Sequence, residues 1–158
     1  YPHKNIKILI QAIEMLKGEV HLALVCARSV FASRVPASSY IHFLGSLPDP
    51  QLIAALRSAS AYIFPSLIEG FGLPGLEAMA VGTPVIAAQA SCLPEIYGDA
   101  ALFFDPFNAD ELSQKIQSVI TDQKLRQSLI SAGRKQVKKY SWAKMAKETW
   151  EIYQRALP

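Results

Sequence analysis

Cysteine and histidine are scarce in this sequence, and their scarcity excludes several classes of site. The 158 residues include two cysteines and three histidines. Cys26 lies in an apolar run, Cys92 lies in an expected loop, and no CxxC pair or cysteine and histidine cluster occurs, so neither a zinc site nor a disulfide framework is predicted. No acidic metal cluster is visible either, and we expect no metal and no other cofactor. A reducing cytosol fits this cysteine usage best.

Long apolar runs are absent as well. The sequence has no stretch of 18 apolar residues and no basic start followed by a short apolar core, which excludes a predicted membrane span or signal peptide. We therefore expect a soluble, cytoplasmic protein. Hydrophobic residues make up 51% of the chain, and no repeat, low-complexity tract or long linker divides it. These features indicate one globular domain over residues 1–158.

Basic residues are concentrated at the C-terminal end. Residues 124–158 hold nine Lys or Arg against Glu148 and Glu151, whereas the first 123 residues hold seven basic and eleven acidic residues. A basic tail can dock on anionic lipid or nucleic acid, but no base-reading motif and no interleaving of aromatic and basic residues accompanies it. We interpret it as a solvated helix face and expect no nucleic-acid partner.

Short apolar runs alternate with segments of helical periodicity. The apolar runs predict buried strands at residues 20–26, 41–44, 61–64 and 84–88, with a shorter apolar piece at 101–104. The periodic segments predict helices at residues 5–16, 48–58 and 73–81. From 109 to 157 the pattern is helical, with breaks near Asp122 and Tyr140, and Ser141 can cap the last helix.

This alternation predicts an α/β fold, a Rossmann-like parallel sheet with helices on both faces. A doubly wound domain normally begins with a strand. This chain instead opens on Tyr1, Pro2 and a helix, with neither an initiator Met nor a leading strand. We therefore expect it to be a piece of a longer protein, lacking its first strand.

The strongest functional signal lies in residues 65–85, PSLIEGFGLPGLEAMAVGTPV. The predicted strand ends at Pro65 and the predicted helix begins at Leu73, with Pro74 suited to its first turn. The segment therefore connects a strand to a helix, and N–H groups at a helix start attract negative or electron-rich oxygens.

Three glycines and two glutamates give this segment its chemistry. Gly70, Gly72 and Gly75 lack Cβ atoms, which suits a place where a ligand or another backbone comes close. Glu69 precedes the turn, and we expect Glu77 in the first helical turn. Two carboxylates around a glycine-rich turn favour the binding of hydroxyls beside a phosphate.

Two other interpretations fit the same residues. The three glycines also satisfy the pattern GxGxxG, and Glu95 lies 20 residues beyond Gly75, where a dinucleotide-binding fold places an acid on the ribose. The turn is in mid-chain, however, and Glu69 would repel a pyrophosphate over the glycines. A nucleotide or dinucleotide-binding module without transfer activity is the alternative function. In the remaining interpretation the glycines only pack helix on strand and both glutamates face water.

Several motifs occur together along the chain. Residues 69–77 fit the spacing E-x7-E inside EGFGLPGLEAMA, and GTPVIA and LPEIYGDAALFFDP follow. Lys4 and Asn5 form a KN pair near the start. In these motifs the sequence resembles the C-terminal, donor-binding domain of the family 4 (group 1) glycosyltransferases, retaining enzymes of the GT-B architecture. The resemblance covers nearly the whole chain, and the motifs together are far more specific than E-x7-E alone.

The resemblance implies a role for each acid and for Lys4. Glu77 matches a carboxylate that accepts hydrogen bonds from the ribose hydroxyls of a nucleotide-sugar donor. Glu69 matches the carboxylate that faces the donor sugar. Lys4 matches the lysine that neutralises the diphosphate as it leaves, although without the resemblance it would be an ordinary exposed lysine before a helix. The catalytic candidates are thus Glu69 and Lys4.

Backbone groups and small side chains are expected to complete the donor site. The turn whose N–H groups meet sugar hydroxyl and diphosphate oxygens would consist of Gly70, Phe71, Gly72 and Leu73. Ser66 is a candidate to reach a phosphate oxygen, with a local cap as the alternative. Residues 43–47, which include Gly45 and Leu47, match the loop where the nucleotide base rests, with a plain turn as the alternative.

The resemblance further implies hexosyl transfer from a nucleoside diphosphate to an acceptor hydroxyl with retention of configuration. In the family, a strand ending in Gly-Arg precedes the KN pair, and an N-terminal domain binds the acceptor. This chain contains neither, so we expect it to bind donor weakly and to transfer nothing alone. The expected partners are the nucleotide-sugar donor and the N-terminal domain. A membrane surface or lipid-linked acceptor at the inner membrane face is a further candidate.

The last helix, around residues 142–157, would by the same resemblance reach back toward that N-terminal domain. Its apolar residues Trp150, Tyr153 and Leu157 would then be partly exposed in this chain, although core packing explains them as well.

Overall fold

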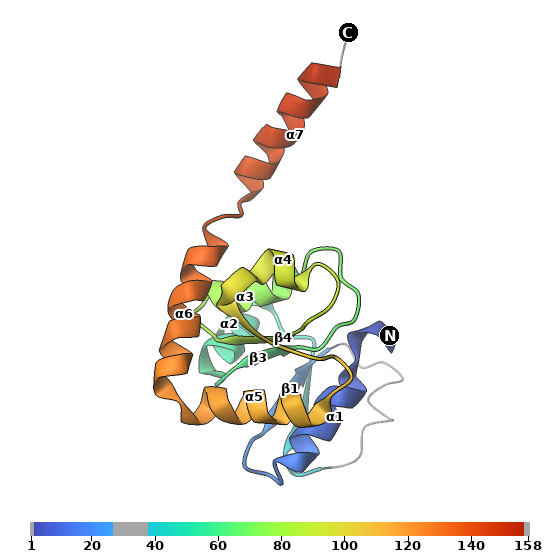
Figure 1. Cartoon of the computed structure of the whole chain (residues 1–158). Helices are drawn as coiled ribbons and strands as arrows, with labels where there is room; N and C mark the ends of the chain where they lie inside the picture. Colours follow the sequence, from blue (N-terminus) through green and yellow to red (C-terminus); the bar gives the residue numbers. More distant parts are fainter. Residues whose placement is uncertain (1, 27–37, 157–158) are drawn as a thin grey trace.

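The computed structural model of the protein describes residues 2–26 and 38–156 (Figure 1). The strands in these two ranges are β1 Leu22–Val25, β2 Ile41–Gly45, β3 Tyr62–Phe64, β4 Val85–Ala88 and β5 Ala101–Phe104. The helices are η1 Pro2–Lys4, α1 Ile6–Met15, α2 Asp49–Ser58, α3 Leu73–Ala80, α4 Leu93–Tyr97, η3 Gly98–Ala100, α5 Ala109–Thr121, α6 Gln123–Val137 and α7 Trp142–Ala156. The expected α/β alternation is confirmed.

The strand pairs in the described residues are all parallel and form two sheets. β1 pairs with β2, and β3, β4 and β5 form a second sheet in that order. Among the described strands, β1 has no partner on its other edge, and neither does β3. One continuous sheet was expected, but no described strand links the free edges of β1 and β3.

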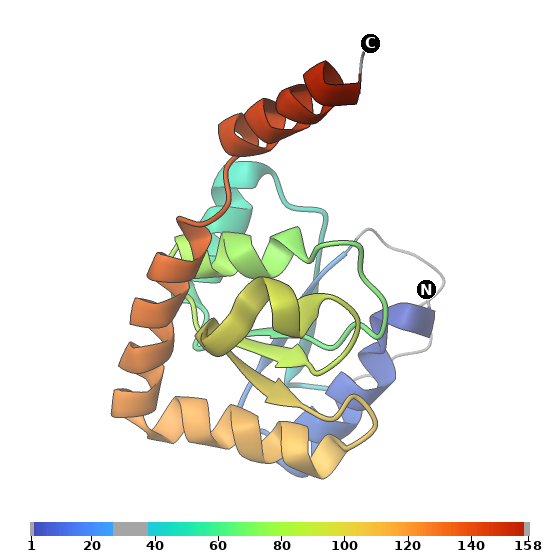
Figure 2. The ribbon, with the colours of Figure 1, turned by 45° about the horizontal axis from the view of Figure 1, so that its top comes forward.

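Helices cover both faces of the second sheet. In Figure 2, β4 and β5 lie between α4, above them, and α5, below them. α1 packs on α5, and α6 packs on α3, α5 and β5. All four residues of β4 are buried, which is why this strand is continuously apolar and shows no alternation.

Side-chain caps separate the C-terminal helices. Asn108 Oδ1 accepts a hydrogen bond from the Glu111 N–H at 3.0 Å, at the start of α5. Asp122 Oδ1 accepts from the N–H groups of Lys124 and Leu125 at 2.9 and 3.0 Å, at the start of α6. The Ser141 Oγ accepts from the Lys144 N–H at 3.1 Å, which confirms its predicted role as a cap of α7.

The last helix, α7, extends away from the rest of the chain (Figure 1). None of its described residues is buried. Trp150 and Tyr153 are 57% and 58% exposed, in line with the expectation of bare apolar positions, while Leu157 lies outside the described residues. No helix in the described part of the chain is both long and apolar enough to cross a membrane.

Two further sequence expectations differ from the structure. Glu77 is the fifth residue of α3, so it lies in the second turn rather than the first. The short helix α4 was not predicted and occupies part of the expected loop after Cys92. Its five residues are too few to display a helical period.

Candidate functional site

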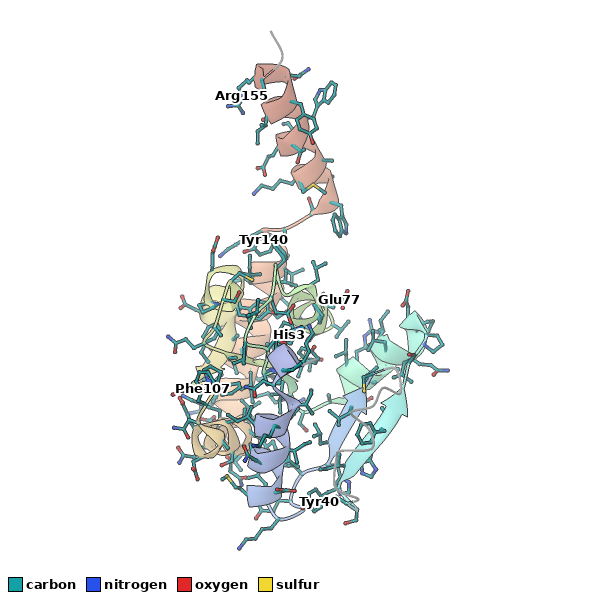
Figure 3. All side chains as sticks on the ribbon, turned by 90° about the vertical axis from the view of Figure 1, so that its right-hand side faces the viewer. His3, Tyr40, Glu77, Phe107, Tyr140 and Arg155 are labelled. Atoms are coloured by element: carbon teal, nitrogen blue, oxygen red, sulfur yellow. The ribbon has the colours of Figure 1, made fainter. Side chains whose placement is uncertain are left out.

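The candidate site lies beyond the carboxyl end of β3. Pro65 and Ser66 follow the strand and are buried. The Leu67 N–H donates to the His3 carbonyl at 2.8 Å, which ties the start of the described chain to this loop. Figure 3 shows His3 and Glu77 toward the same end of the domain, with Tyr40 at the opposite end. The expected residues from the first segment and from the glycine turn are therefore brought together.

Lys4 and Glu69 form an ion pair at the centre of this region. Lys4 Nζ donates to Glu69 Oε1 at 2.6 Å, and their side chains are 41% and 15% exposed. The same ammonium lies 5.8 Å from the centre of the Phe64 ring, within the range of a cation–π contact. Since an ammonium has three donors, the exposed side of Lys4 keeps N–H groups available for a further anion.

The backbone of Glu69 is also fixed. Its carbonyl accepts hydrogen bonds from Ser91 Oγ at 3.0 Å and from Cys92 Sγ at 3.3 Å. Its N–H donates to the same Ser91 hydroxyl at 3.3 Å. The loop before α4 therefore sets the position from which the Glu69 carboxylate reaches Lys4. Sequence reasoning missed both partners, which are polar residues 22 and 23 positions away.

Glu77 is exposed on α3 and has no ion-pair or hydrogen-bond partner among the described side chains. Burial raises the pKa of the Tyr62 phenol well above its ordinary value, and the charges of Glu77 and then Glu69 raise it further. Both carboxylates thus act electrostatically on one phenol at the start of β3.

The turn of residues 70–73, called the glycine turn below, has an unusual backbone. Gly72 adopts a left-handed conformation with φ of +89°, and it lies directly before α3. No hydrogen bond from the N–H groups of Gly70, Phe71 or Gly72 is found within the described residues. These N–H groups are therefore free to bind oxygen atoms of a ligand. Leu73, the first residue of α3, is 43% exposed beside them.

The glycines themselves do not make room for a ligand in the way that the sequence suggested. A Cβ at Gly72 or Gly75 would collide with the side chain of Tyr97, whereas one at Gly70 would meet nothing within 4 Å. The Tyr97 hydroxyl donates to the Gly72 carbonyl at 2.6 Å. Two of the three glycines are thus required by a buried tyrosine. The space beside Gly72 and Gly75 is thus filled by Tyr97, whereas the space beside Gly70 is open.

Ser66 is 1% exposed, and its Oγ has no hydrogen-bond partner within the described part of the chain. A buried hydroxyl without a partner is uncommon, because burial removes its bonds to water. The alternative role for Ser66, a local cap, is therefore not observed. Its position two residues after Phe64 places this hydroxyl in the same loop as Glu69.

Gly45 and Leu47 occupy the carboxyl end of the other sheet. Residues 43–45 belong to β2 rather than to a loop, and Gly45 closes the strand with φ of +71°. Leu47 is partly buried, two residues before α2. The structure thus joins Lys4 through Glu69 to the loop that also holds Ser66 and the glycine turn, whereas Gly45 and Leu47 lie at and just beyond the end of β2 in the other sheet.

The dinucleotide interpretation gains no support from the geometry. Glu95 is exposed in the first turn of α4, seven residues beyond the end of β4, and not at the end of a strand where it could reach a ribose. The interpretation in which the glycines only pack helix on strand is also incomplete, because a Cβ at Gly75 would collide with the Tyr97 side chain.

Comparisons with known proteins give a consistent result. The sequence profile of the family described as "Glycosyl transferases group 1" matches residues 1–136. The chain is 33% identical over 163 residues to O-antigen chain mannosyltransferase B of Escherichia coli, covering 96% of this chain and 43% of that protein. It is also 33% identical over 168 residues to MMP alpha-(1->4)-mannosyltransferase of Mycolicibacterium hassiacum, covering 99% and 41%. The chain thus spans less than half the length of these relatives.

Solved structures share the fold. Anabaena HepE in complex with UDP and glucose aligns with a TM-score of 0.83 at 25% identity, over 98% of this chain and 45% of that one. The C-terminal domain of a group 1 glycosyl transferase from Francisella tularensis aligns with a TM-score of 0.73 at 25% identity, over 88% and 80%. The fold is that of the C-terminal half of GT-B enzymes, and this chain belongs to the group 1 glycosyl transferases, family 4.

Proposed function

We propose that this domain binds a nucleoside-diphosphate sugar and is the donor-binding half of a retaining glycosyltransferase. The observation that carries the proposal is the Lys4–Glu69 ion pair beside a turn with free N–H groups. In that arrangement the cation suits a diphosphate, the carboxylate suits a sugar hydroxyl, and the backbone donors suit the oxygen atoms of either group.

Each acid has its own part in this proposal. Glu77 accepts hydrogen bonds from the ribose hydroxyls, and its exposed, unpaired carboxylate is available to do so. Glu69 faces the sugar, with its backbone held by Ser91 and its carboxylate oriented by Lys4. The unpartnered Ser66 hydroxyl binds a phosphate oxygen. The base rests against the carboxyl end of β2, near Gly45 and Leu47.

The chemistry assigned to this half of the enzyme is stabilisation of the leaving group. As the bond between the sugar and the diphosphate breaks, positive charge develops on the sugar and negative charge on the diphosphate. Lys4 and the N–H groups of Gly70, Phe71 and Gly72 stabilise that negative charge. The Glu69 carboxylate faces the opposite charge on the sugar. The Lys4–Glu69 pair therefore lies across the bond that breaks.

Mannose is the first hexose to test. The two relatives described above are mannosyltransferases by name. HepE was solved with UDP and glucose, so UDP-glucose is the second donor to test. A panel of GDP-mannose, UDP-glucose and the two bare diphosphates, scored by thermal stabilisation of the protein, separates these cases.

We also propose that the complete protein supplies a strand between β1 and β3. The proposed strand is followed in the chain by α1 and then by β1. The rule that such a connection is right-handed applies to two parallel strands of one sheet, so we place the proposed strand parallel to β1. The hydrogen bond between Leu67 and His3 holds the N-terminal end at the carboxyl end of β3, where such a strand would finish. We further propose that the complete protein has an N-terminal, acceptor-binding domain. It would be cytoplasmic and act on lipid-linked acceptors at the inner membrane face.

Calorimetry on two variants tests the division of roles. Glu77→Gln should weaken binding of the bare nucleoside diphosphate, because the diphosphate still carries the ribose. Glu69→Ala should not weaken that binding and should weaken only the intact sugar donor. Equal losses for both ligands in both variants would refute separate roles. A longer protein, with the N-terminal domain, that is inert toward every nucleotide sugar would refute the enzyme assignment.

A further inference from the structure

Phe71 of the glycine turn contacts an aromatic ring from a distant part of the chain. The rings of Phe71 and Tyr140 lie 5.3 Å apart, centre to centre, and meet edge to face at 85°. Tyr140 stands in the short junction between α6 and α7, and Figure 3 shows it at the neck from which α7 leaves the domain. This edge-to-face arrangement is the favourable one for two aromatic rings.

The hydroxyl of Tyr140 acts on the same turn by a second route. It donates to the Ile96 carbonyl at 3.1 Å, a group that also accepts from Gln136 Nε2 at 2.7 Å. The next residue, Tyr97, donates its own hydroxyl to the Gly72 carbonyl. The end of α6 therefore holds α4, and α4 holds Gly72, while the Tyr140 ring contacts the neighbouring Phe71 directly.

These contacts matter because the glycine turn has no regular structure of its own. Phe71 and Gly72 precede α3, and their N–H groups have no acceptor in the described residues. Their direction is therefore set by whatever holds the Phe71 side chain and the Gly72 carbonyl. Donors aimed at a ligand are effective only when their geometry is fixed before the ligand arrives.

We propose that Tyr140 is a positioning residue of the donor site, which fixes the backbone of Phe71 and Gly72 chiefly through the contact of its ring with Phe71, while Gln136 shares the hold of its hydroxyl on α4. The ligand in this inference rests on the proposed function. Tyr140 does not itself touch the donor. Its effect on affinity is transmitted through the glycine turn.

Three variants separate positioning from general packing. Tyr140→Leu removes both the ring contact and the hydroxyl. Tyr140→Phe keeps the ring and loses only a hydrogen bond whose acceptor retains Gln136. Tyr153→Leu removes a tyrosine that is 58% exposed on α7, and it is the matched control.

The readouts are backbone order and affinity. In the ligand-free protein, nitrogen-15 relaxation of Phe71 and Gly72 should give order parameters near about 0.85 in the wild type, Tyr140→Phe and Tyr153→Leu, and below about 0.7 in Tyr140→Leu. Calorimetry with UDP and GDP should show roughly threefold to tenfold weaker binding for Tyr140→Leu alone, the range expected for one aromatic pair.

Tyr140→Leu with a lower melting temperature but unchanged order and affinity would overturn the inference. If Tyr140→Leu does not fold, Phe71→Leu removes the same contact from the exposed side. Its Gly72 order parameter should fall likewise, and an unchanged value would overturn the inference. The relaxation measurement needs no ligand. Failure of wild-type protein to bind any nucleotide would therefore refute the proposed function while leaving the positioning result separately decided.

Discussion

The Lys4 ammonium lies 2.6 Å from the Glu69 carboxylate, and the pair joins the segment before α1 to the loop after β3. In the free protein the cation is balanced by one carboxylate. A diphosphate that enters brings two or more negative charges next to Glu69, so its binding depends on the donors that Lys4 still offers to solvent. The pair therefore links the proposed sugar-facing acid to the proposed diphosphate-binding cation.

Lys4→Met should lower the affinity for UDP or GDP by roughly tenfold or more, because it removes a charge-assisted hydrogen bond. The free energy of unfolding should change by less than about 1 kcal/mol, since Lys4 is 41% exposed and exposed ion pairs contribute little. Calorimetry and urea denaturation measure the two quantities. Lys7→Met, which alters an exposed lysine of α1, should affect neither. Unchanged affinity in Lys4→Met would contradict the assignment of Lys4 to the diphosphate.

Gly75→Ala should destabilise the protein by about 1–3 kcal/mol, because the new Cβ collides with the fully buried Tyr97 and overpacks the core. This cost exceeds the gain in helix propensity of at most about 1 kcal/mol. Gly70→Ala is the matched control, since a Cβ there meets nothing within 4 Å and the residue has no positive φ. Urea denaturation of both variants checks the difference. Equal stabilities would mean that Tyr97 can move away without cost.

Much of the fold followed from the sequence. The strands β1 to β5 and the longer helices fall within a few residues of their predicted ranges, because each is marked by an apolar run or a helical period. The breaks near Asp122 and Tyr140 were predicted, and so was the cap at Ser141, whereas the cap at Asp122 is seen only in the structure. The division into two sheets was not predictable, since an apolar run does not specify which strand it pairs with.

The sequence proposes the candidate site as a set of residues but not as a set of contacts. The E-x7-E motif and the KN pair identify Glu69 and Lys4, yet nothing in either motif says that they pair with each other. The glycines were interpreted as space for a ligand or another backbone, whereas the side chain of Tyr97 fills the space beside two of them. That contact depends on how the chain returns from β4 through α4, and this path is a tertiary property.

Tyr97 should make the stability of the protein fall at high pH. Burial above all, and then the nearby Tyr62, raises the pKa of its phenol above the ordinary value of 10.0. Above pH 10 the unfolded chain therefore loses a proton that the folded chain retains, and folding stability declines as pH rises. The decline contributed by this group is about 1.4 kcal/mol per pH unit until its folded pKa is reached.

Tyr97→Phe removes this contribution. Below pH 9 the variant should be less stable than the wild type by about 1 kcal/mol, because the hydrogen bond to Gly72 is lost. Between pH 10 and 11.5 the difference should shrink and then reverse, since only the wild type carries the Tyr97 penalty, which reaches about 2 kcal/mol at pH 11.5. Urea denaturation across this pH series measures both effects. A constant difference between the two proteins at all pH values would show that Tyr97 does not titrate differently on unfolding.

The caps of α6 and α7 should respond differently to the same kind of substitution. Asp122→Ala removes an oxygen that accepts two N–H groups at the start of α6, a helix that packs on α3, α5 and β5. It should lower the free energy of unfolding by about 1 kcal/mol. Ser141→Ala removes the cap of α7, which has no buried residue. Only the helicity of residues 143–156 should fall, seen in their carbon chemical shifts, with urea denaturation unchanged. A similar loss of global stability in Ser141→Ala would mean that α7 packs against the domain in solution.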